Sequence, residues 1–413
     1  MLRVLHTSDW HLGHTLHEFS RAHEHAQFLD WLLDCIVGRD IDALLVAGDV
    51  FDTANPPAEA QQAFYRFLAQ ARARRPSLDV VVIGGNHDSA ARLDAPAPIL
   101  RSLGVRVVGG LPQRQGVIDL DRVLIPLKDR DGAIAAWVAA VPFLRPADLP
   151  AVEDGDDPLI EGVRRIYGQV FEGARARREG HQALIAMGHC YMTGTKLSEL
   201  SERKILGGNQ HALPVDLFPD DVAYVALGHL HLAQRVGGLE HVRYSGSPIP
   251  LSLDEERYTH QVLVVDIDGP RLKGVEALEI PRTVEILRVP KEPRPLDEVL
   301  QELAKLPELD PTAPDWKRPY LEVRVLLDKP RPSLRYEIDD ALKNKAARLA
   351  TTRVTQTGTG AALGDVRATK SLRDMSAEEV FRMLYASKHE GEPSPELLEA
   401  FHELVADVEG APA

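Results

Sequence analysis

Seven side chains of metal-binding type follow apolar runs of this sequence, in clusters of the order Asp-x-His, Gly-Asp, Gly-Asn-His-Asp, Gly-His and Gly-His-x-His. Imidazoles, carboxylates and one amide suit a borderline or hard divalent ion such as Mn²⁺ and need no thiolate. A single histidine after a strand is usually structural, but the ordered recurrence of five clusters is not expected from turn chemistry alone. The candidate metal ligands are Asp9, His11, Asp49, Asn86, His189, His229 and His231.

The spacing within a cluster allows neighbouring residues to share one ion. Residues two apart on an extended chain project to the same side, so Asp9 and His11 can bind one ion together, as can His229 and His231. Glycine precedes four of the clusters. It permits a tight turn and a close approach of the backbone to a bound group.

Two metal ions about 3.5 to 4 Å apart can share a hydroxide and stabilise the attacking and leaving oxygens of a phosphoryl displacement. Such a pair requires a bridging carboxylate, and Asp49 is the natural candidate because it follows a buried run and a glycine. The other ligands would divide into Asp9, His11 and one of His229 and His231 at the first ion, and Asn86, His189 and the remaining histidine at the second.

His87 remains as a histidine that is not needed as a ligand. It would lie over the scissile phosphate, where it could protonate a leaving oxygen or stabilise developing charge. Asp52 or Asp88 could orient its ring. The predicted catalytic residues are therefore His87, Asp52 and Asp88.

Strands and helices must bring these clusters together. The expected buried strands are residues 41–47, 80–83, 183–187 and 222–227; the expected helices are 27–37, 60–73 and 159–178; a hairpin is expected over 124–144. In open α/β sheets, sites form where the carboxyl ends of adjacent strands converge. We therefore expect an α/β domain over residues 1–275 with the clusters at one edge of its sheet.

The rest of the chain changes in composition. A small α+β domain is expected at 283–358, with strands at 284–289 and 320–327 and a helix at 296–306, followed by a linker at 359–373 and amphipathic helices within 374–413. The apolar residues of those helices have little to pack on, which favours a partner surface over docking onto their own domain.

Charge is distributed unevenly. The net charge of −14 argues at first against nucleic acid, but from Asp374 onward ten acidic residues face two basic ones. Residues 343–373 carry seven basic residues against Asp365 alone. A basic segment next to an acidic one indicates that the two segments bind different partners. The alternative is that both segments are simply exposed to solvent.

Length and composition restrict the remaining classes. At 413 residues, two or three domains of about 100 to 200 residues each are expected. No apolar run approaches the roughly 20 residues of a membrane helix, and the start of the chain leads directly into Asp9 without a cleavable signal. Two cysteines make neither a disulfide framework nor a thiolate zinc site. We expect a cytoplasmic protein that does not bind a membrane.

The order of motifs resembles that of the calcineurin-like metallophosphoesterases and, within them, the bacterial SbcD nuclease subunits. The segments that carry the resemblance are His6-Thr-Ser-Asp9-Trp-His-Leu-Gly13, Gly48-Asp-Val-Phe-Asp52, Gly85-Asn-His-Asp88, Ala226-Leu-Gly-His-Leu-His231 and Arg243-Tyr-Ser-Gly-Ser-Pro248. It covers residues 1 to about 270 closely. It implies two mixed β-sheets flanked by helices, a small α+β domain that caps DNA, and C-terminal helices.

The resemblance also implies ligands, cofactors and partners. It assigns Asp9, His11, Asp49 and His231 to one Mn²⁺, Asp49, Asn86, His189 and His229 to a second, and catalysis to His87. It implies exonuclease and endonuclease activity on double-stranded DNA ends and hairpins in DNA repair and recombination. The partner implied is an SbcC-type ATPase, bound by the C-terminal helices, in a heterotetramer built on a homodimer.

Three alternatives use the same fold. A protein phosphatase would follow Asp52 with Arg-Gly, whereas this sequence continues with Thr53, and it would have Glu in place of Asp88. A cyclic-nucleotide phosphodiesterase would not require a capping domain or an amphipathic tail. A non-catalytic scaffold would be expected to lack one or more ligands, and none is missing.

Overall fold

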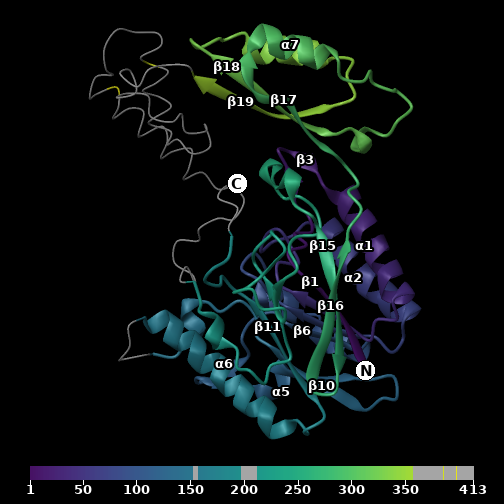
Figure 1. Ribbon diagram of the computed structural model, residues 1–413, viewed down its shortest axis with the longest axis vertical. Helices are drawn as coiled ribbons and strands as arrows, with labels where there is room; N and C mark the ends of the chain where they lie inside the picture. Colours follow the sequence, from purple (N-terminus) through teal and green to yellow (C-terminus); the bar gives the residue numbers. More distant parts are fainter. Residues whose placement is uncertain (152–156, 197–211, 357–384, 386–396, 398–413) are drawn as a thin grey trace. The chain divides into compact units, whose positions relative to one another are not determined.

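The computed structural model describes residues 1–151, 157–196 and 212–356, together with Tyr385 and Leu397. Among these residues, two six-stranded sheets carry the candidate ligands (Figure 1). The first sheet has the order β16 (Arg271–Glu279), β15 (Gln261–Asp268), β1 (Leu2–Thr7), β4 (Ala43–Ala47), β5 (Asp79–Ile83) and β6 (Val105–Val108). The second has the order β13 (Gln234–Arg235), β14 (Val242–Tyr244), β12 (Tyr224–Gly228), β11 (Ala183–His189), β10 (Ile134–Ala140) and β9 (Leu124–Lys128).

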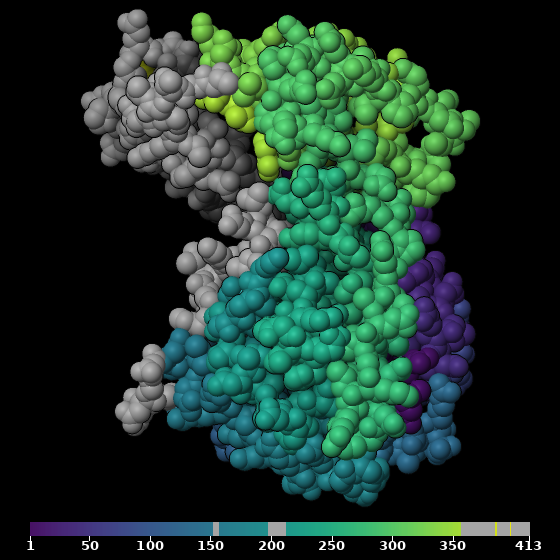
Figure 2. Space-filling model, viewed as in Figure 1, coloured from purple at the N-terminus to yellow at the C-terminus, as the bar shows by residue number. Residues whose placement is uncertain are grey.

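Both sheets are mixed: the first is antiparallel at one edge and the second at both edges. Strands β1, β4, β5 and β6 run parallel, whereas β15 pairs antiparallel with β1 and β16 antiparallel with β15. In the second sheet β10, β11, β12 and β14 run parallel, with β9 and β13 antiparallel. The edge strand β16 carries exposed side chains and lies on the surface seen in Figure 2 (green). The predicted fold of two mixed sheets flanked by helices is confirmed.

The two faces of the first sheet enter different cores. On β4, Leu45 faces the second sheet, whereas Leu44 packs with α1 (Ala22–Gly38) and α2 (Ala58–Arg74). Helix α6 (Pro158–Arg177) packs on the second sheet, and Figure 1 shows it on the opposite side from α1 and α2. Because β4 is buried on both faces, its sequence is continuously apolar rather than alternating.

The expected elements of this region are present, with their ends shifted by up to five residues. The four predicted strands correspond to β4, β5, β11 and β12, and the three predicted helices to α1, α2 and α6. The predicted hairpin consists of β9 and β10, joined by a turn in which Asp129 accepts hydrogen bonds from the backbone of Asp131 and Ala133. No described helix has both the length and the apolar character to span a membrane.

A smaller, three-stranded sheet follows in the order β17 (Ile286–Pro295), β18 (Tyr320–Leu327) and β19 (Arg348–Gln356), with helices α7 (Leu296–Ala304) and α8 (Leu334–Leu342). The sequence predicted β17, β18 and α7 but missed α8 and β19. Helix α8 buries only Ile338 and Leu342, and most of β19 is half-buried or exposed, so neither shows a clear apolar period. The predicted linker and C-terminal helices lie outside the described residues, and the domain boundaries remain a prediction.

The buried His6 joins the two six-stranded sheets. Its Nε2 lies 3.2 Å from the Leu227 carbonyl oxygen, which can only accept, so Nε2 donates there and Nδ1 accepts from the Tyr224 hydroxyl at 2.9 Å. This arrangement requires a neutral ring. Burial, followed by the repulsion of Arg243, lowers the pKa of His6 from 6.5 to about 3, although the hydrogen bond to Leu227 opposes the shift.

The stability of the fold is therefore expected to fall in acid. A histidine whose pKa is lowered by folding contributes stability at neutral pH that is lost as the pH falls from 6.5 towards 3. In His6→Gln, the loss of unfolding free energy per pH unit below 6.5 should be smaller by about 1.4 kcal/mol than in the wild type. Urea unfolding in EDTA at several pH values measures this. An identical pH dependence in both proteins would contradict the assigned role of His6.

Candidate metal centre

The candidate ligands come from strand ends of both six-stranded sheets. Asp9 and His11 follow β1, Asp49 follows β4, and Asn86 follows β5 in the first sheet. In the second sheet His189 ends β11, and His229 and His231 follow β12. Since the parallel strands of the two facing sheets end at the same side, the fold brings together all seven side chains.

Four of these residues have unusual backbone conformations. The φ angles of Asp9, His11, Asp49 and His229 are 54°, 46°, 48° and 103°, in the left-handed region that side chains other than glycine rarely adopt. Backbone hydrogen bonds hold two of them, from the Asp9 N–H to the Gly48 carbonyl and from the His11 N–H to the Asp49 carbonyl, both at 3.0 Å. Strain of this kind collects at functional sites.

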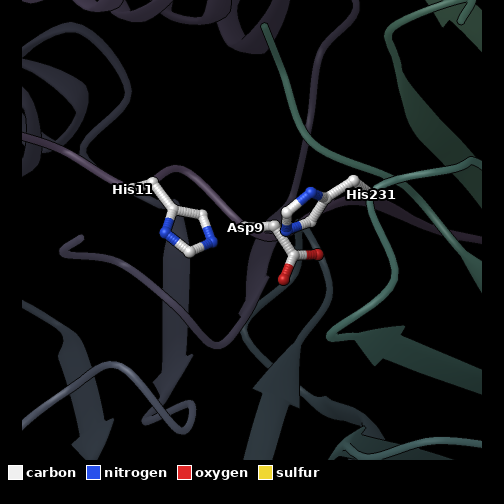
Figure 3. Close-up of side chains that lie close together, drawn as sticks. All are labelled: Asp9, His11 and His231. Carbon is white, nitrogen blue, oxygen red and sulfur yellow. The ribbon is translucent and has the colours of Figure 1, made fainter. Parts of the chain in front are cut away.

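Asp9, His11 and His231 form the first group of donors. One ligand atom from each lies within 4.8 Å of the others, and Figure 3 shows the Asp9 carboxylate next to the His231 ring, with the His11 ring to one side. The Asp9 carboxylate accepts hydrogen bonds from the Ser8 hydroxyl at 2.5 Å and from the His229 N–H at 2.9 Å. Its oxygens are thereby held in place.

Asp49 and His189 connect this group to the second. Nε2 of His189 lies 3.3 Å from Asp49 Oδ2 and 2.9 Å from Asn86 Oδ1, and His229 Nδ1 lies 3.0 Å from the same amide oxygen. Asp9, Asp49 and His189 also offer ligand atoms within 4.8 Å of one another. Asp9 is common to these two groups, and Asp49 Oδ2 lies within 3.5 Å of a ring nitrogen of both His11 and His189.

The orientation of the rings suits metal binding. His189 Nδ1 donates to the Ala47 carbonyl at 2.9 Å, and His11 Nδ1 lies 3.2 Å from Asp52 Oδ1, so each ring directs Nε2 inward. His11 Nε2 is buried without a hydrogen-bond partner, 3.5 Å from Asp49 Oδ2. An orphaned imidazole nitrogen facing carboxylates fits a divalent cation.

The protonation states show how strongly charge is concentrated here. Burial alone would lower the pKa of His189, but the charge and hydrogen bond of Asp49 raise it to about 9. Burial opposes ionisation of Asp49 too, yet His189 and His11 hold its pKa well below the usual range. Burial raises the pKa of Asp9 and lowers that of His229 to about 3. A bound cation would favour the anionic carboxylates and the neutral imidazoles.

The structure distinguishes the three predicted catalytic residues. His87 is half-buried at the edge of the site. Its backbone N–H donates to Asp49 Oδ1 at 2.9 Å, and its ring Nδ1 donates to the Asp52 carbonyl at 2.8 Å. The Asp52 backbone, rather than its carboxylate, therefore contacts His87, and the carboxylate lies against His11. Asp52, His11 and His87 form a third group of nearby donors.

Asp88 has a different environment. Its buried carboxylate accepts from the backbone N–H groups of Val50 at 3.1 Å, Phe51 at 3.0 Å and Gly85 at 2.9 Å. Burial, reinforced by the charge of Asp49, raises its pKa to about 6. These bonds join the loops after β4 and β5, so Asp88 positions the two loops and does not orient the His87 ring.

Sequence reasoning missed Glu255 and did not single out Ser8. The buried Glu255 places Oε1 2.9 Å from Nδ1 of His231, but no spacing rule links an acid 24 positions downstream to a histidine. Ser8 supports Asp9 and lies inside the first motif, which was its only signal. Gly85 is required for packing, because a β-carbon there would overlap Asp49 Oδ1.

Trp10 supports the first cluster from behind. Its fully buried indole packs edge-on against Phe28, Phe64 and Phe67, and its Nε1 donates to Thr7 at 2.9 Å. This packing anchors the strained turn between Asp9 and His11.

Trp10→Ala should lower the free energy of unfolding by about 3 to 5 kcal/mol, because it leaves a cavity among aromatic rings. It should also weaken Mn²⁺ binding, since Asp9 and His11 flank the lost side chain. Urea unfolding in EDTA and metal titration test the two effects separately. Trp31→Ala, a change at a half-buried tryptophan of α1, is the control and should leave metal binding intact. Unchanged Mn²⁺ affinity in Trp10→Ala would contradict the anchoring role.

Comparison with known proteins gives consistent matches. Residues 2–233 match a family model described as calcineurin-like phosphoesterase, and residues 282–389 match one described as type 5 capsule protein repressor C-terminal domain. The SbcD subunit of the SbcCD nuclease from Rhodobacter capsulatus is 43% identical over 361 residues, covering 86% of this chain and 88% of the relative. The SbcD subunits from Escherichia coli and Bacillus subtilis are 38% and 37% identical, covering 68% and 64% of this chain and 69% and 66% of the relatives.

Proposed function

The chain belongs to the calcineurin-like phosphoesterases and, within them, to the SbcD subunits of SbcCD nucleases, and on that premise we propose that its metal centre hydrolyses the phosphodiester bonds of DNA. The observation that carries this proposal is the convergence of seven donor side chains around Asp49, with the buried His11 Nε2 lacking any hydrogen-bond partner. These side chains supply the nitrogen and oxygen donors that two-metal hydrolysis would use.

We propose that Asp9, His11, Asp49 and His231 hold one divalent ion, and that Asp49, Asn86, His189 and His229 hold the other. Nitrogen and oxygen donors without thiolate suit a borderline or hard divalent ion, and we propose Mn²⁺. A pair of ions bound there would activate the attacking water and stabilise negative charge on the phosphate oxygens. The bonds from Ser8 and from the His229 N–H keep the Asp9 carboxylate oriented towards the ions.

His87 is the proposed catalytic residue that does not bind metal. Because its Nδ1 donates to the Asp52 carbonyl, Nε2 is the ring nitrogen that would interact with a substrate. From there it can donate a proton to the leaving oxygen or stabilise charge on the phosphoryl group. Asp52 positions both histidines, His87 through its carbonyl and His11 through its carboxylate.

The size of the groove beside the site favours a polynucleotide over a small phosphate ester. The groove has a volume of about 1150 Å³, begins at Asn86 and is lined by three arginines (Arg114, Arg122 and Arg145) and four acidic residues (Asp88, Asp94, Asp119 and Asp148). Arg145 donates to the Asp88 carbonyl at 3.1 Å, so a guanidinium lies beside the loop that carries His87. Such a groove can hold a DNA strand next to the scissile phosphate, with arginines near its backbone.

The family also suggests partners. We propose that the chain acts as a homodimer within a heterotetramer with an SbcC-type ATPase, on double-stranded DNA ends and hairpins in the cytoplasm. The free cysteines Cys35 and Cys190 are consistent with a reducing compartment. Residues 374–413 are the proposed ATPase-binding segment, and the residues before them, 283–358, are the proposed capping domain.

The decisive experiment is cleavage of linear double-stranded DNA and of a DNA hairpin in Mn²⁺, with and without the ATPase and ATP. We expect the wild type to cut both substrates and Asp49→Ala to cut neither, because loss of the shared carboxylate disrupts both ions. Hydrolysis of a small phosphodiester with intact DNA in every condition would retain the metal centre and refute the DNA assignment.

His87→Ala should reduce kcat for DNA cleavage by about 100-fold to 10,000-fold, the usual contribution of a positioned acid. Mn²⁺ stoichiometry and DNA binding should stay at wild-type values, because His87 is not a proposed ligand. His181→Ala, a change at an exposed histidine, is the matched control and should retain full activity. Full activity of the His87 variant would remove that residue from the mechanism.

A further inference from the structure

The loop between β14 and β15 contacts His231 through the carboxylate of Glu255. Glu255 is fully buried; its Oε1 lies 2.9 Å from His231 Nδ1, and its Oε2 accepts from the Leu251 N–H at 2.8 Å. Glu255 belongs to the short 3₁₀ helix η3 (Leu253–Arg257). The orientation of the His231 ring therefore depends on the position of η3.

An arginine from the small three-stranded sheet holds η3. Arg288 of β17 donates through Nη2 to the Leu253 carbonyl at 2.6 Å and to Asp254 Oδ1 at 3.1 Å, and its Nη1 lies 3.4 Å from Glu256. The guanidinium therefore contacts the residues on both sides of Glu255. On its own sheet, Arg288 Nε lies 2.8 Å from the buried Glu322 of β18.

The same loop is held at its other end. Arg21 donates to the Pro250 carbonyl at 2.6 Å and forms a two-pronged ion pair with Glu24, at 2.5 and 2.7 Å. Tyr320 of β18 donates its hydroxyl to Glu24 at 2.8 Å. Arg21 and Glu24 are almost fully buried, so this chain of bonds is shielded from water and is costly to break.

We propose that Glu255 is a positioning residue for His231 and that Arg288 extends this control to the small sheet, which thereby sets the metal affinity of the site formed by Asp9, His11 and His231. This inference rests on the proposed metal function. A carboxylate bonded to the second nitrogen of a ligating histidine sets its tautomer and ring orientation, and losing it typically weakens metal binding about 10-fold to 100-fold. Displacement of β17 would move Arg288 and η3, shift the Glu255 carboxylate and weaken metal binding in the same way.

The second proposed metal site serves as the reference against which a change at the first site is measured. Asn86 and His189 come from the ends of β5 and β11, not from the loop that Arg288 holds. Movement of the small sheet therefore affects first the ion held by Asp9, His11 and His231. The contact of Arg288 with η3 makes the affinity of this site depend on the position of β17 and β18.

The test is Mn²⁺ titration of the full chain by calorimetry, with electron paramagnetic resonance to count the bound ions. The wild type should bind two ions, and Arg288→Ala should weaken one site about 10-fold while the other changes less than about twofold. Arg294→Ala is the matched control, because Arg294 lies on the same strand but pairs with the exposed Glu298. It should match the wild type.

Two changes at Glu255 complete the design. Glu255→Ala should weaken the same site as Arg288→Ala, and Glu255→Gln, which keeps an acceptor oxygen, should restore part of the affinity even if the alanine variant folds poorly. Wild-type affinities in Arg288→Ala would overturn the link to the small sheet. Equal weakening of both sites would also overturn it, because that indicates general loosening. A wild type that binds fewer than two ions would refute the proposed two-metal centre itself.

Discussion

The whole site depends on the carboxylate of Asp49. It accepts the His87 N–H, approaches His189 to 3.3 Å and His11 to 3.5 Å, and carries a negative charge in a buried setting because these neighbours stabilise it. A buried carboxylate on its own would be neutralised by burial. The surrounding histidines therefore keep the Asp49 carboxylate ionised, in addition to being candidate metal ligands.

Holding so many polar groups together requires a rigid support. The two six-stranded sheets provide it through strands buried on both faces, and the left-handed backbone at Asp9, His11 and Asp49 is stabilised by bonds to neighbouring strand ends. Trp10 and Asp88 act in the same way at longer range, one by aromatic packing and the other by joining two loops. Local strain persists because the surrounding fold leaves these turns no alternative.

Support for the ligands is unequal around the site. His11 and His189 are oriented by groups of the first sheet, Asp52 and the Ala47 carbonyl. His231 is oriented by Glu255, on a loop held by Arg288. One candidate ligand is thus tied to Arg288, more than fifty positions downstream, in a sheet that contributes no candidate ligand of its own. This asymmetry provides a physical basis for regulating the metal centre through the small three-stranded sheet.

The sequence by itself determined the α/β class, the main strands and helices of the first 270 residues, and the types of the seven candidate ligands. These depend on local periodicity and on motifs in which glycine, aspartate and histidine have few alternative explanations. It did not predict α8 or β19, whose apolar residues are few and irregular, or assign a role to Glu255, whose distance along the chain from His231 follows no rule. Only the tertiary structure decided that Asp88 bonds three backbone amides, that Asp52 reaches His87 through its carbonyl, and that Arg288 holds the loop whose Glu255 contacts His231. Each of these depends on how segments far apart in sequence pack together, and no local pattern encodes such packing.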